Sequence, residues 1–276
     1  MHVNAVIHRF LTHDSDFPLT YGLIVDRRME CGAVAIRGLN ELANTANQHP
    51  DACAYGKIAV VAGDGIHTFQ ATSEGFAIPV FCGNSTAAAI KCLGGRGDIQ
   101  TVLHGADGGR YRVAARIEGD TVLQTWTLAA GVAEERQWRG RSVLILRTFN
   151  DYAIVPDDLP DGMSAEAARI ELLGPTDGGK LAIVKRSQPE PIVEFYNANG
   201  RHGAAPQTGL ATIALGARSI DWLRDVFSSG QIAYETRAGL RRAAMPRITD
   251  SSCGGLSLGL RGITVNLTRL PMGLAA

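Results

Sequence analysis

The sequence predicts an α+β fold in two similar halves, and three observations support this prediction. Short β-branched or aromatic segments greatly outnumber helical segments along the chain. They do not alternate one for one with helices, which favours antiparallel sheets over a βαβ chain. A loop followed by an apolar helix of small residues occurs twice, over residues 81–90 and again over residues 205–215. Both helices are apolar on nearly all sides, so we expect each to be buried within the strands of its own half.

The expected strands are β-branched or aromatic segments, or alternate in polarity, and most end near Gly, Asp, Asn or Pro. They are Ala5–Ile7, Leu23–Val25, Ile58–Ala62, Gln100–Leu103, Arg110–Ile117, Thr121–Leu128, Ser142–Arg147, Tyr152–Val155, Lys180–Lys185, Ile192–Tyr196, Gln231–Glu235, Leu256–Leu260 and Ile263–Leu267. Residues 107–109 and 118–120 are typical of hairpin turns. The expected helices are Leu39–Gln48, Thr86–Leu93, Ala165–Leu173 and Leu210–Ile220. Ser164 is a plausible N-cap for the third of these helices.

Composition restricts the class of protein. The chain has 276 residues, of which 45% are hydrophobic, enough for one large or two moderate domains with a sizeable core. Lys plus Arg and Asp plus Glu both number 27, so no basic field exists to follow a nucleic-acid backbone. No long uncharged apolar run predicts a transmembrane helix, and Met1–Phe10 is too polar for a signal peptide. We therefore expect a cytoplasmic protein that binds neither nucleic acid nor membrane.

No cofactor or metal is expected from the motifs. The 5 cysteines are scattered without a CxxC pair, and each taken alone is most simply a small buried hydrophobic residue. The Gly-rich segments 94–97 and 177–180 lack the context and spacing of a phosphate-binding loop. The 7 histidines show no paired ligand spacing, which predicts no bound metal.

The repeated loop-and-helix unit predicts the domain organisation. We expect an N-terminal half over residues 1–130 and a C-terminal half over residues 131–261, with a last strand in residues 262–276 returning to the first half. Each helix begins in a loop rich in Gly, Ser, Thr or Asn, whose backbone amides suit an anion. Two such helix starts facing each other would hold a small molecule with two carboxylates. The alternative is that both are ordinary capped helices of the core.

This arrangement resembles the diaminopimelate epimerase-like superfamily. The resemblance implies two pseudo-symmetric halves, each with strands curled around a central helix, and an active site in the cleft between them. Racemases and epimerases of that group typically use two cysteines, one at each helix start, as opposed acid and base. Cys82 with Gly83 and Asn84 fits the first of these motifs. The second position is Pro206, which cannot transfer a proton, so a two-thiol racemase is disfavoured.

Three segments are more similar to the PrpF branch of that superfamily, the 2-methylaconitate isomerases and 4-oxalomesaconate tautomerases. They are Cys82–Ala88, a lysine opening an apolar strand at Lys57–Val61, and His202–Gly209. Other segments differ from the pattern of this branch. The Ser/Thr-rich run that precedes the lysine in the branch is absent here. A late His-Pro-x-Gly segment is also replaced, here by Thr236–Gly239.

The resemblance assigns roles to particular residues. Lys57 is the candidate base, because an apolar strand could remove the ammonium from water and favour its neutral form. Cys82 is the candidate acid or orienting partner, at a helix start that favours proton exchange. Without the resemblance, Lys57 is more simply an exposed lysine at a strand edge. The other candidates, all for binding substrate carboxylates, are Arg9, Gly83, Asn84, Ser85, Thr86, Asn150, His202, Thr208, Gly209 and Arg237. For Asn150, a purely structural role in a turn is an equal alternative.

The function that these residues predict is a cofactor-independent isomerase acting on a small unsaturated di- or tricarboxylic acid. Moving a double bond along an allylic acid needs one proton removed and one returned. Two alternatives stay open: an amino-acid racemase, epimerase or lyase with a single cysteine, and a non-catalytic carboxylate-binding protein. A homodimer is also left open.

Overall fold

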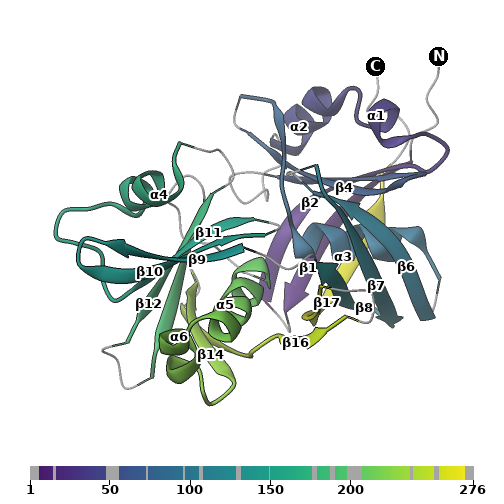
Figure 1. Cartoon of the computed structure of the whole chain (residues 1–276). Coiled ribbons are helices and arrows are strands. Elements are labelled where there is room, and N and C mark those ends of the chain that lie inside the picture. Colours follow the sequence, from purple (N-terminus) through teal and green to yellow (C-terminus); the bar gives the residue numbers. More distant parts are fainter. Residues whose placement is uncertain are drawn as a thin grey trace. The chain divides into compact units, whose positions relative to one another are not determined.

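The computed structural model describes residues 6–14, 17–47, 56–72, 74–95, 97–105, 108–128, 132–148, 150–175, 179–186, 190–197, 207–236, 239–251 and 255–270 (Figure 1). The chain divides into two compact units. Unit 1 is Met1–Thr127 together with Gly259–Ala276, and unit 2 is Leu128–Leu258. Among the described residues, no helix is both long enough and apolar enough to cross a membrane.

The strands of unit 1 form a ring. Their sheet runs in the order β1-β2-β3-β4-β6-β7-β8-β17, and β17 also pairs with β1, which closes the ring. A short strand, β5, is added beside β4. The bounds of these strands are β1 Val6–Asp14, β2 Phe17–Arg27, β3 Lys57–Ala62, β4 Gly65–Ala71, β5 Ala77–Pro79, β6 Gly97–His104, β7 Arg110–Glu118, β8 Thr121–Leu128 and β17 Leu256–Arg269.

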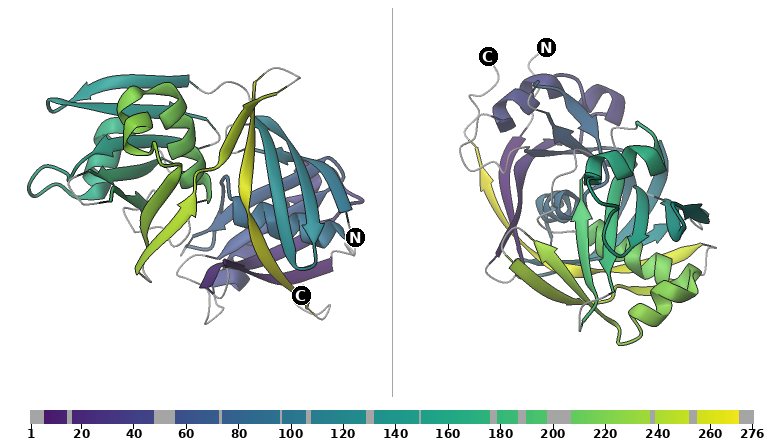
Figure 2. Two further views of the ribbon diagram at one scale, coloured as in Figure 1. Left: turned by 90° about the horizontal axis from the view of Figure 1, so that it is seen from below. Right: turned by 90° about the vertical axis from the view of Figure 1, so that its left-hand side faces the viewer.

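Helix α3, Gly83–Leu93, lies inside this ring and is seen end-on among the strands in the right-hand view of Figure 2. Its residues from Gly83 to Ile90 are all buried. The three alanines Ala87–Ala89 explain how it fits, because small side chains let the surrounding strands approach closely. The expected burial of this apolar helix is confirmed.

The outer face of the same strands carries a second layer. Helices α1, Gly32–Ala35, and α2, Leu39–Asn47, cover this face (Figure 1). The cluster beneath them contains Leu23, Val25, Ala35, Leu39, Ala43, Ile58, Val60, Ala62, Phe69 and Ala71. Since side chains alternate between the two faces of a strand, residues between these positions are directed toward α3 instead.

Unit 2 has an open sheet in the order β15-β14-β13-β12-β11-β10-β9. Its strands are β9 Val132–Trp138, β10 Arg141–Arg147, β11 Asp151–Pro156, β12 Lys180–Lys185, β13 Ile192–Tyr196, β14 Gln231–Thr236 and β15 Gly239–Ala244. Its helices are α4 Ala165–Leu173, α5 Gln207–Ser219 and α6 Asp221–Val226. Helix α4 packs on one face through Ala168, Leu172 and Leu173, and its N-cap Ser164 accepts a hydrogen bond from the Ala167 amide at 3.1 Å. The prediction of that cap is confirmed.

The two sheets repeat one order of pairings. In unit 1, β2–β3 is parallel, β3–β4 antiparallel, β4–β6 parallel and β6–β7 antiparallel. In unit 2, β11–β12, β12–β13, β13–β14 and β14–β15 follow the same sequence of orientations. Helix α3 precedes β6, and α5, followed by the short helix α6, precedes β14. The repeat seen in the sequence is therefore a repeat of whole supersecondary units.

The sheets are mixed, which corrects the expectation of antiparallel sheets. The parallel pairs arise because helical crossovers separate β2 from β3 and β11 from β12, and a crossover returns the chain in the same direction. The two segments expected at Leu256–Leu260 and Ile263–Leu267 form the single strand β17. Strands β4, β5, β9 and β15 were not expected from the sequence, and neither was the short strand β16, Arg247–Asp250.

Candidate functional site in unit 1

Cys82 is the residue from which α3 begins. It has an extended backbone, and its carbonyl accepts hydrogen bonds from the Thr86 amide at 2.9 Å and the Thr86 hydroxyl at 2.8 Å. The preceding residue, Phe81, is buried and packs edge-on against Tyr111, with ring centroids 4.8 Å apart. Aromatic packing on one side and helix hydrogen bonds on the other therefore hold the thiol at the first turn of a buried helix. The thiol is free and half-buried.

Lys57 opens β3 and lies on the strand face that is directed toward α3. Its register partners are Gly22 on β2 and Gln70 on β4, and its ammonium donates a hydrogen bond to Gln70 Oε1. The residue keeps some exposed surface, but its ammonium end is enclosed by protein. Burial lowers the pKa of Lys57, and a charge on Cys82 opposes this shift more weakly. The two groups are therefore close enough to interact electrostatically.

Gly22 makes the close approach of β2 and β3 possible at this point. A Cβ on Gly22 would lie 2.0 Å from the Lys57 carbonyl oxygen and 2.7 Å from Phe10 Cε1. These distances leave no room for any side chain other than hydrogen. The strand that carries Lys57 is thus held in place by a backbone contact.

The first turn of α3 carries buried polar atoms that suit a ligand. Asn84 Nδ2 donates a hydrogen bond to Thr20 Oγ1 at 2.7 Å, and Gln124 Nε2 donates one to the Gly83 carbonyl at 3.0 Å. Within the described part of the chain, Asn84 Oδ1 and Ser85 Oγ are buried and have no hydrogen-bond partner. Buried polar atoms are normally paired, so such atoms at a helix start favour a binding site. Gln70, Gln124 and Thr20 were not predicted from the sequence.

Arg9 is not brought together with this group. It pairs in register with Leu23, which belongs to the cluster beneath α1 and α2, and its neighbour Phe10 pairs with Gly22 on the Lys57 face. Alternation along β1 therefore directs Arg9 to the opposite face of the sheet from Lys57. The sequence could not establish this, because the register of β1 against β2 is not visible in it.

The predicted residues of unit 2 gather at the start of α5. Thr208 and Gly209 lie in its first turn and are buried, and Thr208 has a side-chain hydrogen bond with Tyr152. Burial raises the pKa of Tyr152, and that hydrogen bond acts in the opposite direction. Asn150 is also buried and lies directly before β11, two residues from Tyr152. His202 and Arg237 lie outside the described residues.

Lys180 is a further candidate that sequence reasoning missed. It opens β12 as Lys57 opens β3, and the two strands occupy equivalent places in the repeated order of pairings. Its register partner is Tyr152, and its ammonium lies 5.7 Å from the centre of the Tyr152 ring. The scarcity of lysine among the basic residues was the available signal, because Lys57 and Lys180 are both strand-opening lysines.

No protein-family model matches the sequence, and no curated protein matches it either. Solved structures do match it over almost its whole length. They include a phenazine biosynthesis PhzC/PhzF protein from Clostridium difficile, at a TM-score of 0.54 and 8% identity over 98% of this chain and 99% of that one. A predicted epimerase from Pseudomonas aeruginosa matches at a TM-score of 0.59 and 11% identity, over 98% of this chain and 100% of that one.

A hydroxyproline epimerase from Agrobacterium vitis also matches, at a TM-score of 0.50 and 13% identity over 98% of this chain and 93% of that one. Together with the topology, these similarities identify the fold as diaminopimelate epimerase-like, as the sequence predicted. The PrpF branch is not among these three structures.

Proposed function

We propose that this chain is a cofactor-independent isomerase that transfers protons on a small carboxylic acid. One observation carries the proposal: a lysine enclosed by protein, with a lowered pKa, interacts with a cysteine at the start of a buried helix. Strongly perturbed groups beside a potential partner are frequent at catalytic sites. The fold supports the same class of activity, since epimerases are among the proteins that share it.

Lys57 is the base in this proposal. A lowered pKa increases the fraction of neutral amine, which is the only form that can accept a proton from carbon. Gln70 fixes the amine, because its Oε1 accepts a hydrogen bond from Nζ. Removing the allylic proton leaves a dienolate whose negative charge spreads onto the substrate carboxylate.

Cys82 returns a proton at the far end of the allylic system. Its S–H donates a proton to the γ-carbon of the dienolate. The resulting thiolate then recovers a proton from the Lys57 ammonium, which restores both groups. One proton leaves the substrate and one is returned, so the step is balanced without oxidant, reductant or metal-bound intermediate.

Substrate carboxylates are bound at the first turn of α3 in this proposal. The backbone amide groups of a helix's first turn stabilise an anion, and the Ser85 hydroxyl can donate a hydrogen bond in addition. Asn84 positions the turn by its bond to Thr20, and Gln124 does so by its bond to Gly83. We propose an unsaturated di- or tricarboxylic acid of the kind that PrpF-like isomerases use.

Proton exchange in deuterated water tests this function. The purified protein is incubated with trans-aconitate, 2-methylaconitate or trans-4-hydroxy-L-proline, and exchange is followed by ¹H NMR. We expect deuterium at an allylic carbon of an unsaturated acid, together with a shifted double bond. Label at the α-carbon of the amino acid would instead indicate an epimerase with a single cysteine.

Two variants make the experiment specific. Lys57→Ala should lose exchange, whereas Lys91→Met should keep it, because Lys91 pairs with Asp120 at the far end of α3. Exchange that persists unchanged in Lys57→Ala would refute the assigned base. No exchange with any acid, combined with tight binding of one of them, would identify a non-catalytic carboxylate-binding protein.

A further inference from the structure

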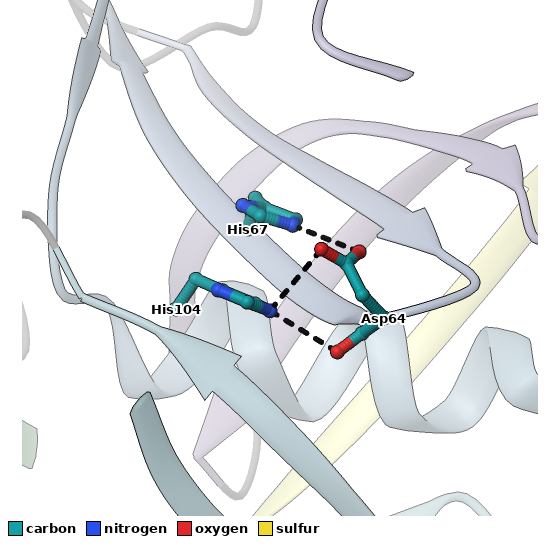
Figure 3. Close-up of side chains that lie close together, drawn as sticks. All are labelled: Asp64, His67 and His104. Carbon is teal, nitrogen blue, oxygen red and sulfur yellow. Dashed lines mark hydrogen bonds and ion pairs between the residues drawn. The ribbon is translucent and has the colours of Figure 1, made fainter. Parts of the chain in front are cut away.

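Asp64, His67 and His104 form a compact cluster in unit 1, and Figure 3 shows their side chains directed toward one another. His67 Nε2 lies 3.4 Å from Asp64 Oδ1, and His104 Nε2 lies 3.7 Å from Asp64 Oδ2. His104 Nε2 is also 3.1 Å from the Asp64 carbonyl oxygen. One potential ligand atom from each residue falls within 4.8 Å of the others.

The topology explains why residues so far apart in sequence meet here. Asp64 lies in the turn between β3 and β4, and His67 is on β4. Strands β4 and β6 are parallel, and His67 pairs in register with His104. The two imidazole rings consequently stack, with centroids 4.1 Å apart and planes only 9° apart. Sequence spacing predicted no metal because it reveals ligands on one segment, not across a parallel pair of strands.

This cluster is separate from the Lys57 site. His67 pairs in register with Val60, which belongs to the cluster beneath α1 and α2. Lys57 pairs with Gln70, on the face directed toward α3. Side chains at His67 and Gln70 leave β4 on opposite faces, because three positions separate them along the strand.

The surroundings are adapted to these side chains. A Cβ on Gly32 would lie 2.4 Å from His67 Nε2 and 2.8 Å from Asp64 Oδ2, so a larger residue there would displace the ends of these side chains. The Gly32 amide donates a hydrogen bond to the Asp64 carboxylate, which orients it. The side chains of Asp64, His67 and His104 remain 37%, 15% and 20% exposed, so an ion can reach them from solvent.

We propose that Asp64, His67 and His104 bind one divalent transition-metal ion, with zinc preferred. Two imidazole nitrogens and one carboxylate oxygen are a donor set that zinc accepts, with a fourth position left for water. Binding requires each imidazole to carry its proton on Nδ1, so that Nε2 offers a lone pair. The ion would replace the hydrogen bonds to Asp64 and connect the β3–β4 turn to β6. Its role is to stabilise unit 1, because the Lys57 site lies on the other face.

Zinc binding by the full-length protein tests this proposal. Protein stripped with EDTA is titrated with zinc chloride by calorimetry, and its Tm is measured with and without zinc. We expect one ion per chain and a higher Tm with zinc, because a ligand that binds only the folded state stabilises it. Changing both His67→Gln and His104→Gln should weaken binding by at least about 10-fold. His13→Gln is the matched control and should bind as the unchanged protein does, since His13 lies beside Asn266 instead.

Wild-type protein that takes up no zinc at about 100 µM, or a double variant that binds it equally well, would overturn the proposal. If the double variant does not fold, histidine modification by diethylpyrocarbonate on the wild-type protein decides. Zinc should then protect His67 and His104 but leave His13 reactive. Protection of none of the three, or equal protection of all of them, would also overturn the proposal.

Discussion

At the scale of single residues, variants of Lys57 distinguish a proton-transfer enzyme from a carboxylate-binding protein. If Lys57 is the base, Lys57→Ala should lower kcat by about 10²–10⁴, as removal of a general base commonly does. Lys57→Arg should fail almost as badly, because a guanidinium does not deprotonate. Steady-state kinetics measure both, with Lys91→Met as the control. An arginine variant with near-normal kcat and a raised KM would make Lys57 a binding residue only.

The lowered pKa of Lys57 also predicts how stability depends on pH. Between its lowered value in the folded protein and its ordinary value of 10.5, the unfolded chain holds a proton that the folded chain lacks. Stability contributed by this group therefore rises with pH across that range. Lys57→Met should remove this rise, so its stability relative to the wild-type protein should be greatest at the lower end of this pH range. Urea unfolding at several pH values measures it, and an unchanged slope in the variant would contradict the burial of an uncharged amine.

Among the described cysteines, Cys82 is expected to be the one that a substrate protects. Burial raises the pKa of Cys92 to about 11, so its thiolate is scarce at neutral pH and it should react slowly. Cys31 is exposed and is expected to react whether or not ligand is present. Alkylation by iodoacetamide, mapped by mass spectrometry, should label Cys31 and Cys82 first. A dicarboxylate analogue should then protect Cys82 alone, and protection of Cys31 instead would contradict the assigned site.

At the scale of elements, the position of Lys57, the proposed base, depends on a tight contact between two strands. Gly22→Ala places a methyl group 2.0 Å from the Lys57 carbonyl oxygen, so β2 and β3 must separate. Overpacking of this kind costs about 1–3 kcal/mol in the free energy of unfolding. Gly119→Asn is the control, because Gly119 lies in an exposed turn with open space and a left-handed φ of 61° that asparagine tolerates. Urea unfolding of both variants measures the difference, and equal stabilities would contradict the close approach.

Many of the helices and strands could be predicted from the sequence, and the elements and pairings that were missed have physical reasons. Buried helices of small residues and the Ser164 cap depend on local pattern, so the sequence shows them directly. Strand β4 was missed because polar residues interrupt its apolar pattern. His67 contacts Asp64 on one face, and Gln70 accepts a hydrogen bond from Lys57 on the other. Parallel pairing was missed because it depends on crossovers and register, not on local composition.

At the scale of the whole molecule, the repeated order of pairings shows which roles the two units share. Each unit has a buried helix whose first turn carries buried polar side chains, and each has a lysine at the start of the equivalent strand. The sequence places a thiol only at the first of these helix starts, since Pro206 occupies the second. Whether one substrate contacts both units stays a prediction of the sequence, and the two lysines provide its test.

Lys180 is expected to bind substrate, not to transfer its proton. It faces the Tyr152 ring, which stabilises a cation, whereas Lys57 is enclosed and loses its charge more readily. Lys180→Met should therefore raise KM and leave kcat within a few-fold, and Lys180→Arg should restore most of the affinity, because a guanidinium also binds carboxylates. Lys185→Met is the control, since Lys185 pairs with Glu194 at the other end of β12. Steady-state kinetics on these variants measure both constants. An unchanged KM in Lys180→Met would show that Lys180 does not bind the substrate. The proposed roles of Lys57 and Cys82 would not be affected by that result.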